Sequence, residues 1–348
     1  MDTMEKETFK TFSNKVLTGT ASGIVIGLIP AAILSGIFEA LTPYSSIFSS
    51  LSAVVGTMQF LTAAMIGVLV ANQFKLNAIQ SVIVGAATFL GSGAYSVSEA
   101  GITLIGIGDL VNIMLTAGFA VYLTRKLNDR LGSMTLILLP IIVGVGAGTV
   151  GLLMLPYVSS ATSMIGHILN SFTILQPLLM TILIAIAFSI LIISPVSTVA
   201  IAIAIGISGL GAGAASIGVT ACTAVLVIGS KEVNQKGTTL AILLGGMKMM
   251  MPNLVRHPKL LIPVILNAIL SSIGVYLFNI QGAPHTAGFG IVGLVGPIQA
   301  LETGAGLLPV FITYFIVPFA GAVIIDIILN RVLKMYEHDI FKFLPAAN

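Results

Sequence analysis

One hundred consecutive residues, 131–230, contain no aspartate, glutamate, lysine or arginine, and residues 260–301 form a second stretch of this kind. Soluble domains carry about 25% charged residues, whereas this chain has 8% charged and 57% hydrophobic residues. A helix crosses the hydrocarbon core of a bilayer with about 20 apolar residues, so each stretch can hold several spans. The apolar runs are continuous, as in LLMTILIAIAFSILII, and lack the alternation of membrane barrels. The sequence therefore predicts an all-α polytopic membrane protein.

The distribution of lysine and arginine predicts the orientation of this protein. We predict about ten transmembrane helices, at residues 17–41, 50–71, 77–97, 103–123, 133–156, 174–193, 197–213, 214–229, 260–280 and 306–329. With a cytoplasmic N-terminal segment (1–15), all fifteen basic residues fall at or near the cytoplasmic side, and the opposite loops hold Glu99 and Glu302. This is the positive-inside pattern, and it predicts that both termini are cytoplasmic and that 197–229 forms a hairpin.

Three apolar stretches are interrupted by glycine and proline, at residues 91–109, 237–259 and 282–305. Irregular backbone is tolerated at membrane depth only where it is buried in protein or lines a cavity. Transporters build substrate sites from such discontinuous segments. We therefore expect 237–259 and 282–305 to be re-entrant segments, and all three stretches to form the substrate site. The alternative is that these glycines only allow helices to pack closely.

Residues 159–173 (SSATSMIGHILNSFT) follow Pro156 and have a two-sided pattern. Met164, Ile168 and Phe172 fall on one helical face, and polar side chains occupy the rest. The pattern predicts an amphipathic helix at the membrane interface, acting as a connector or as part of a dimer contact.

Four polar residues in the second and third broken stretches are candidate substrate ligands. Lys248 lies in GGMKMMMPN, where an ammonium in lipid would cost about 2.5–3.5 kcal/mol. It can bind an anionic ligand or pair with a carboxylate, unless it extends to the membrane surface. Asn253 can line a polar pocket with its amide. His285 and Thr286 can donate hydrogen bonds to a hydroxylated ligand, and His285 is alternatively a solvated loop residue.

Five further polar residues are candidates in other segments. Asp109 and Asn112 lie one helical turn apart. Acids within a membrane mark ion or substrate pathways, although Asp109 can also stabilise a helix N-terminus. Gln176, Ser197 and Ser92 offer uncharged hydrogen-bonding groups suited to a polyol, or contacts between helices.

The sequence carries no signature of a catalytic, metal-binding or nucleic-acid-binding protein. Metal-ligating residues do not cluster at useful spacing, and no catalytic triad can be assembled from lone serines and histidines. No basic stretch is dense enough for nucleic acid. We therefore predict no cofactor and no catalytic residue, and a buried apolar role for the single cysteine, Cys222.

Six segments, taken in order, carry a resemblance to a known family. They are GSGA (91–94), LPYV (155–158), ILQPLLM (174–180), ISPVSTVAIAIAIG (193–206), GGMKMMMPN (245–253) and GAPHTAGFGIVGLVGPI (282–298). Over nearly its whole length the chain resembles the membrane-embedded IIC component of bacterial phosphotransferase systems (PTS). More narrowly, it resembles the branch that includes perfringolysin-regulator-type proteins.

The resemblance implies one IIC-like domain over residues 1–348 in the bacterial inner membrane, a homodimer in contact with lipid, and re-entrant hairpins around a sugar site. It also implies IIB and IIA phosphocarrier proteins as partners. Two features depart from the family pattern: a glutamate expected near Gly246 is missing, and the family's site histidine has no clear counterpart. A carboxylate binds sugar hydroxyls through charge-assisted hydrogen bonds, so its absence argues against ordinary sugar phosphorylation.

These observations support three hypotheses about function. The first is a IIC-like permease for a small polar metabolite, a sugar or sugar derivative, phosphorylated by a separate IIB partner. The second is a membrane sensor or regulator built on a transporter scaffold. The third is a secondary transporter coupled to protons or sodium through Asp109 or Glu99.

Overall fold

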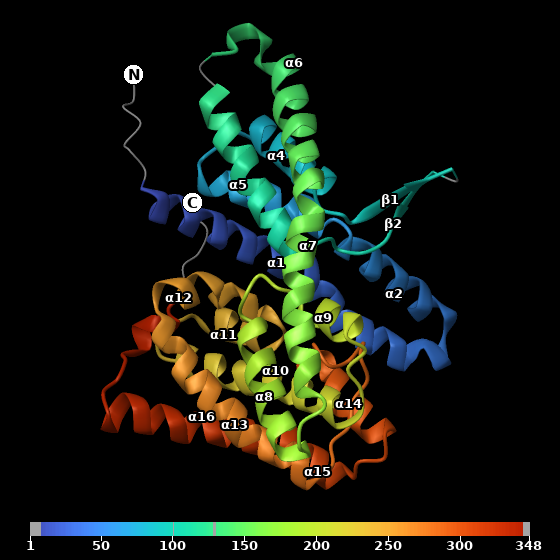
Figure 1. Cartoon of the computed structure of the whole chain (residues 1–348), viewed down its shortest axis with the longest axis vertical. Coiled ribbons are helices and arrows are strands. Elements are labelled where there is room, and N and C mark those ends of the chain that lie inside the picture. The colour runs from blue at the N-terminus through green and yellow to red at the C-terminus, as the bar shows by residue number, and fades with distance from the viewer. Residues whose placement is uncertain (1–7, 100, 128–129, 344–348) are drawn as a thin grey trace. The chain divides into compact units, whose positions relative to one another are not determined.

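The computed structural model describes residues 8–99, 101–127 and 130–343 and is predominantly helical (Figure 1), which confirms the all-α prediction. The chain divides into two compact units. The first contains the described residues up to Ala31 together with Val54–Ser159, and the second contains Ala32–Ala53 and Ser160–Phe343. Residues 1–7 of the predicted N-terminal segment lie outside the described residues, and helix α1 (Phe9–Leu41) begins just after them. The single domain over residues 1–348 stays a prediction.

Membrane-length helices are fewer than the sequence predicts. In the described part of the chain, five are long and apolar enough to cross a membrane: Phe9–Phe38, Thr135–Phe172, Gly209–Ser230, Pro258–Leu277 and Leu307–Val332. A sixth span would be the pair α2 (Ser46–Gln59) and α3 (Thr62–Gln73), which is bent by 46°. The predicted count of ten is therefore not confirmed, because several apolar segments form helices that are shorter than a bilayer is thick.

The first unit surrounds a core of small and branched side chains such as Val84 and Ile113, both fully buried. Its elements, besides parts of α1 and α2, are α3, α4 (Ala78–Leu90), α5 (Leu110–Leu127), the 3₁₀ turn Gly132–Met134, α6 (Thr135–Leu139), the π-helical turn Pro140–Ala147 and the start of α7 (Gly148–Phe172). Helix α4 begins with a capping box, in which Asn77 and Gln80 satisfy each other's backbone N–H groups.

A β-hairpin in the first unit corrects the sequence prediction. Strands β1 (Tyr95–Ser98) and β2 (Gly101–Leu104) pair antiparallel, although the predicted spans 77–97 and 103–123 included most of these residues. The hairpin projects from the helices of its unit (Figure 1). The segment is rich in β-branched and aromatic residues, which favour strands over helices.

Helix α7 continues through Pro156 without a break. The predicted amphipathic connector, 159–173, is therefore the C-terminal part of a longer helix, and its position at the membrane interface stays a prediction. Proline removes one backbone hydrogen bond from a helix, but such losses are tolerated in membrane helices.

The second unit is built around α10 (Gly209–Ser230), which contacts α8, α13 and α16 (Figure 1). Its other elements are α8 (Pro177–Leu191), α9 (Thr198–Ala204), α11 (Lys236–Leu243), α12 (Met251–Arg256), α13 (Leu261–Leu277), α14 (Val295–Glu302), α15 (Leu307–Phe311) and α16 (Val317–Asp326). Short turns connect or extend them, at Thr42–Tyr44, Gly246–Met250, Pro258–Leu260, Val292–Leu294, Ile312–Ile316, Ile327–Val332 and His338–Phe341.

Small residues allow the neighbours of α10 to approach its backbone. A Cβ added at Gly218 would overlap the backbone of Ala185 in α8, and one added at Gly213 would overlap the carbonyl of Ile280. The predicted boundary between two short segments at residues 213 and 214 is wrong, because Gly213 lies inside α10. The segment instead forms the seven-residue α9 and the 22-residue α10, and a hairpin in the membrane stays a prediction.

Candidate functional site

Lys248 lies in the 3₁₀ turn Gly246–Met250, and only 6% of the residue is exposed. Its Nζ donates hydrogen bonds to the carbonyl oxygens of Ser194, at 2.6 Å, and Val196, at 2.8 Å. Lys248 therefore fastens the second broken stretch to the segment before α9, rather than extending to the surface. A protonated lysine has three N–H donors, so in that form one remains for a further acceptor.

The third broken stretch contacts the N-terminus of α9. Thr198 Oγ1 donates to the carbonyl oxygen of Gly288 at 3.0 Å. The backbones approach so closely that a Cβ on Gly288 would lie 2.6 Å from the backbone nitrogen of Val199. Ser197 caps α9, because its hydroxyl accepts from the backbone N–H of Ala200 at 3.2 Å. The second broken stretch, the third broken stretch and the segment before α9 therefore meet around the start of this short helix.

The third broken stretch also packs closely against helix α10. Gly290 has a left-handed φ of +61°, and a Cβ at that position would lie 2.9 Å from the carbonyl oxygen of Ser216 in α10. Gly296 is equally crowded, because its Cβ would overlap the Ser216 hydroxyl. Tyr314 donates to that hydroxyl at 3.1 Å. We name the interlocked segments 193–198, 245–253 and 282–297 the broken-helix cluster.

The other candidates in the second unit have local or structural contacts. Thr286 is buried, and its hydroxyl both donates to and accepts from the backbone of Ala283, which closes a tight turn. His285 is exposed on this turn, and Gln176 is exposed at the start of α8. Among the described residues, neither exposed side chain forms a hydrogen bond to the broken-helix cluster.

Asn253 holds the C-terminal segment, 336–343, against the protein. Its buried Nδ2 donates to the carbonyl oxygens of Ile340, at 2.9 Å, and Lys342, at 2.8 Å. Asn234 acts in the same way, since its Nδ2 donates to the carbonyl oxygen of Phe341 at 2.6 Å. The structure thus gives Asn253 backbone partners that sequence reasoning did not anticipate.

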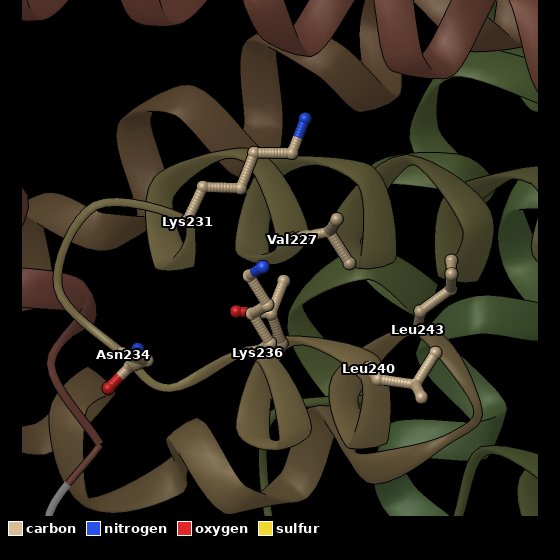
Figure 2. Close-up of a pocket in the computed structure, with 7 residues that line it drawn as sticks. Val227, Lys231, Asn234, Lys236, Leu240 and Leu243 are labelled. Carbon is tan, nitrogen blue, oxygen red and sulfur yellow. The ribbon is translucent and has the colours of Figure 1, made fainter.

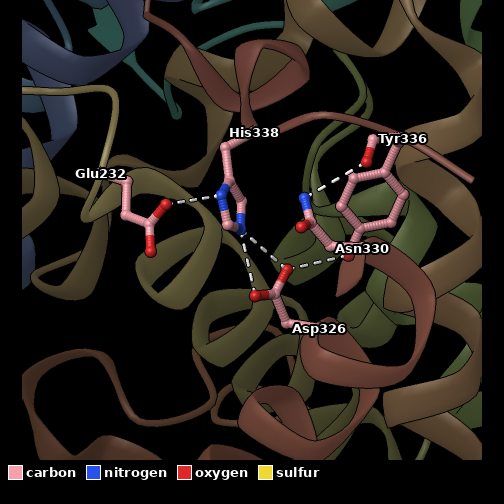
Figure 3. Close-up of polar contacts among 5 residues, drawn as sticks. All are labelled: Glu232, Asp326, Asn330, Tyr336 and His338. Atoms are coloured by element: carbon pink, nitrogen blue, oxygen red, sulfur yellow. Dashed lines mark hydrogen bonds and ion pairs between the residues drawn. The ribbon is translucent and has the colours of Figure 1, made fainter. Parts of the chain in front are cut away.

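A charged cluster around His338 also holds the C-terminal segment (Figure 3). His338 Nδ1 lies 2.9 Å from the Glu232 carboxylate, and Nε2 lies 3.0 Å from that of Asp326. Tyr336 donates to Asp326 at 3.0 Å. Burial and the Asp326 carboxylate raise the pKa of Tyr336, so it remains a neutral donor. Only the imidazolium can donate to both carboxylates.

The candidates in the first unit also bond to nearby backbone. Asn112 Nδ2 donates to the carbonyl oxygens of Gly91, at 2.6 Å, and Gly151, at 2.9 Å. Asp109 Oδ1 accepts from the backbone N–H of Asn112 at 2.9 Å, which is a helix-capping contact. Ser92 donates to a backbone carbonyl one turn earlier. These bonds favour a packing role for the first broken stretch, and its contribution to a substrate site stays a prediction.

A family model described as "Phosphotransferase system, EIIC" matches residues 14–343, a range that includes all nine candidate site residues. No curated protein and no solved structure matches the chain. The narrower resemblance to perfringolysin-regulator-type proteins stays a prediction.

Proposed function

The chain belongs to the phosphotransferase system EIIC family, and from this premise we propose that it carries a sugar or sugar derivative across the bacterial inner membrane. Family membership makes it a membrane permease component of that system. In our proposal a separate IIB protein supplies the phosphoryl group on the cytoplasmic side, where both termini lie. The functional form is a homodimer.

The proposed substrate site is the broken-helix cluster. Its support is the buried Lys248 ammonium, which connects two discontinuous segments through the carbonyl oxygens of Ser194 and Val196. Membrane proteins keep irregular backbone at depth where it is buried or lines a cavity, and transporters use such segments to bind substrate. The third N–H of Lys248 and the hydroxyl of Ser197 are the groups that we assign to substrate binding.

Lys248 also offers a replacement for the missing family glutamate. The expected position falls near Gly246, two residues before Lys248. An ammonium donates hydrogen bonds, whereas a carboxylate accepts them. Lys248 would therefore donate to the hydroxyl oxygens of the substrate or to an anionic substituent on it. This reversal predicts that an acidic sugar derivative binds more tightly than the corresponding neutral sugar.

Two measurements test this function on the purified full-length protein. The first is thermal stability against a panel of neutral sugars, acidic sugars and sugar phosphates, because a ligand that binds only the folded state raises the melting temperature. At a concentration of 100 Kd the expected stabilisation is about 2.7 kcal/mol. The second is uptake of the best ligand into proteoliposomes, with and without a phosphorylated IIB protein.

Each outcome selects one hypothesis. Uptake that requires the phosphorylated partner supports the proposal. Uptake that instead follows an imposed proton or sodium gradient contradicts it and supports the ion-coupled transporter. Ligand binding without uptake under either condition supports the sensor.

A further inference from the structure

A pocket with a volume of about 360 Å³ opens between the last turn of α10 and helix α11 (Figure 2). We call it the lysine pocket, and its lining residues are Val227, Lys231, Asn234, Lys236, Thr239, Leu240 and Leu243. In Figure 2, Leu240 and Leu243 lie to the right, Asn234 lies to the left, and Lys236 lies between them, below Val227. The pocket therefore has an apolar end and a polar end.

The polar end carries uncompensated positive charge. Lys231 and Lys236 are both exposed, and neither ammonium has a hydrogen-bond or ion-pair partner among the described residues. The nearest acid in the sequence, Glu232, is paired with His338 at 2.9 Å. Asn234 is held by the C-terminal segment, so its amide does not offset the charge. The two lysines are thus available to an anion.

The pocket lies where a membrane-spanning helix ends. Helix α10 has 22 residues and ends at Ser230, directly before Lys231. At 1.5 Å per residue such a helix is about 33 Å long, which matches a hydrocarbon core of about 30 Å. A helix of this length that crosses the bilayer places the residue after it, Lys231, at the depth of the lipid headgroups.

We propose that the lysine pocket binds an anionic phospholipid, with the phosphate between Lys231 and Lys236 and the start of one acyl chain on Leu240 and Leu243. A soluble anion would use the two ammonium groups and leave the apolar end empty. A zwitterionic lipid would fill the apolar end, but its own cation would oppose the lysines. An anionic lipid is the occupant that satisfies both ends.

The test compares lipids on the detergent-purified full-length protein by native mass spectrometry and thermal stability. We expect phosphatidylglycerol to bind more tightly than phosphatidylcholine of the same chain length. The double variant Lys231→Gln/Lys236→Gln should lose about 30-fold in phosphatidylglycerol affinity, at about 1 kcal/mol for each lysine near an anionic surface and about 1.4 kcal/mol for each tenfold. The matched control is Lys10→Gln/Lys126→Gln, which removes two other exposed lysines.

Three results would overturn the proposal. One is an unchanged preference for phosphatidylglycerol in the Lys231/Lys236 variant. Another is equal protection by inorganic phosphate or glycerol phosphate, which would assign the pocket to a free anion. The third is a variant that keeps its lipid preference but loses binding to a phosphocarrier protein, which would assign the surface to that partner. Leu243→Asn provides a second variant, because it should weaken binding of long-chain lipid while leaving both lysines in place.

Discussion

Asn112 in the first unit and Lys248 in the second each donate two hydrogen bonds to backbone carbonyl oxygens from a buried position. Asn112 does so with a neutral amide, and its acceptors belong to two glycines at which helices approach each other closely. Lys248 does so with an amine that carries a charge when it is protonated, and its acceptors belong to one short loop before α9. The two contacts have similar geometry, but a charge within a membrane is far more expensive than an amide.

Two other asparagines show that the amide contact is a general packing device in this protein. Asn267 Nδ2 donates to the carbonyl oxygens of Ala221 and Pro318, at 2.9 and 3.0 Å, and Asn253 holds the C-terminal segment in the same way. Neutral amides are therefore enough to fasten segments elsewhere in this protein, whereas position 248 uses a longer, basic side chain. The use of lysine supports a role for Lys248 beyond packing, and the following predictions test this comparison.

The largest effect is expected for Lys248→Met. The variant loses two charge-assisted hydrogen bonds, each contributing about 1.5 kcal/mol or more, so we expect a loss of about 3 kcal/mol in unfolding free energy. Because the third donor is assigned to substrate, ligand affinity should also fall by at least tenfold. Thermal unfolding and ligand titration in detergent measure both quantities, and Lys10→Met is the matched exposed control.

The two quantities separate the two roles of Lys248. A loss of stability with unchanged ligand affinity would mean that Lys248 has only a packing role, as Asn112 has. The proposed difference between the two residues would then be wrong. A loss of affinity with unchanged stability would mean that the contacts to Ser194 and Val196 contribute little to folding.

A smaller effect is expected for Asn112→Ala. Hydrogen bonds between side chains and neighbouring membrane helices contribute about 0.6 kcal/mol on average and at most about 1.7 kcal/mol. We expect the variant to lose about 1–2 kcal/mol in stability and to keep the ligand affinity of the parent. Asn170→Ala, at an exposed position of α7, is the control. Reduced affinity at unchanged stability would return Asn112 to the substrate site.

Thr198→Val tests the contact between α9 and the third broken stretch. Valine keeps the shape of threonine but cannot donate to Gly288, so the expected loss of stability is about 1 kcal/mol. Because this bond joins two segments of the broken-helix cluster, we also expect a severalfold loss of ligand affinity. Thr149→Val, whose hydroxyl bonds only within its own helix, should change neither measurement. If the two variants behaved equally, the bond from Thr198 to Gly288 would not contribute to the substrate site.

The sequence predicted the class of fold because long apolar stretches without charged residues can enter a membrane as helices. It also predicted that 237–259 would be broken, and the glycine and proline residues there do divide the segment into α11, a 3₁₀ turn and α12. Residues 95–98 and 101–104 form paired strands instead of span ends, and α7 continues through Pro156. Tertiary packing overrides local preference at such positions, so hydropathy could not distinguish these outcomes.

The candidate site was predictable only in part. The cost of an ammonium in lipid singled out Lys248, and it is indeed buried. Its partners are main-chain carbonyl oxygens, which leave no mark in a sequence, so the contact with Ser194 and Val196 required the structure. The cluster of Glu232, Asp326 and His338 was missed for a related reason, since its members lie on segments that are far apart in the sequence.

The smallest effect is expected for Asp109→Asn, which tests the ion-coupled alternative. Asparagine and aspartate are about equally good helix caps, and an amide oxygen can accept from the backbone N–H of Asn112 as the carboxylate does. We therefore expect a change in stability of no more than a few tenths of a kcal/mol, and no change in uptake driven by phosphorylated IIB. Asp109→Ala, which removes the cap, should lose about 1 kcal/mol in stability. An Asp109→Asn variant that keeps its stability but loses gradient-dependent uptake would make this carboxylate a coupling group, and the functional centre would then include the first unit.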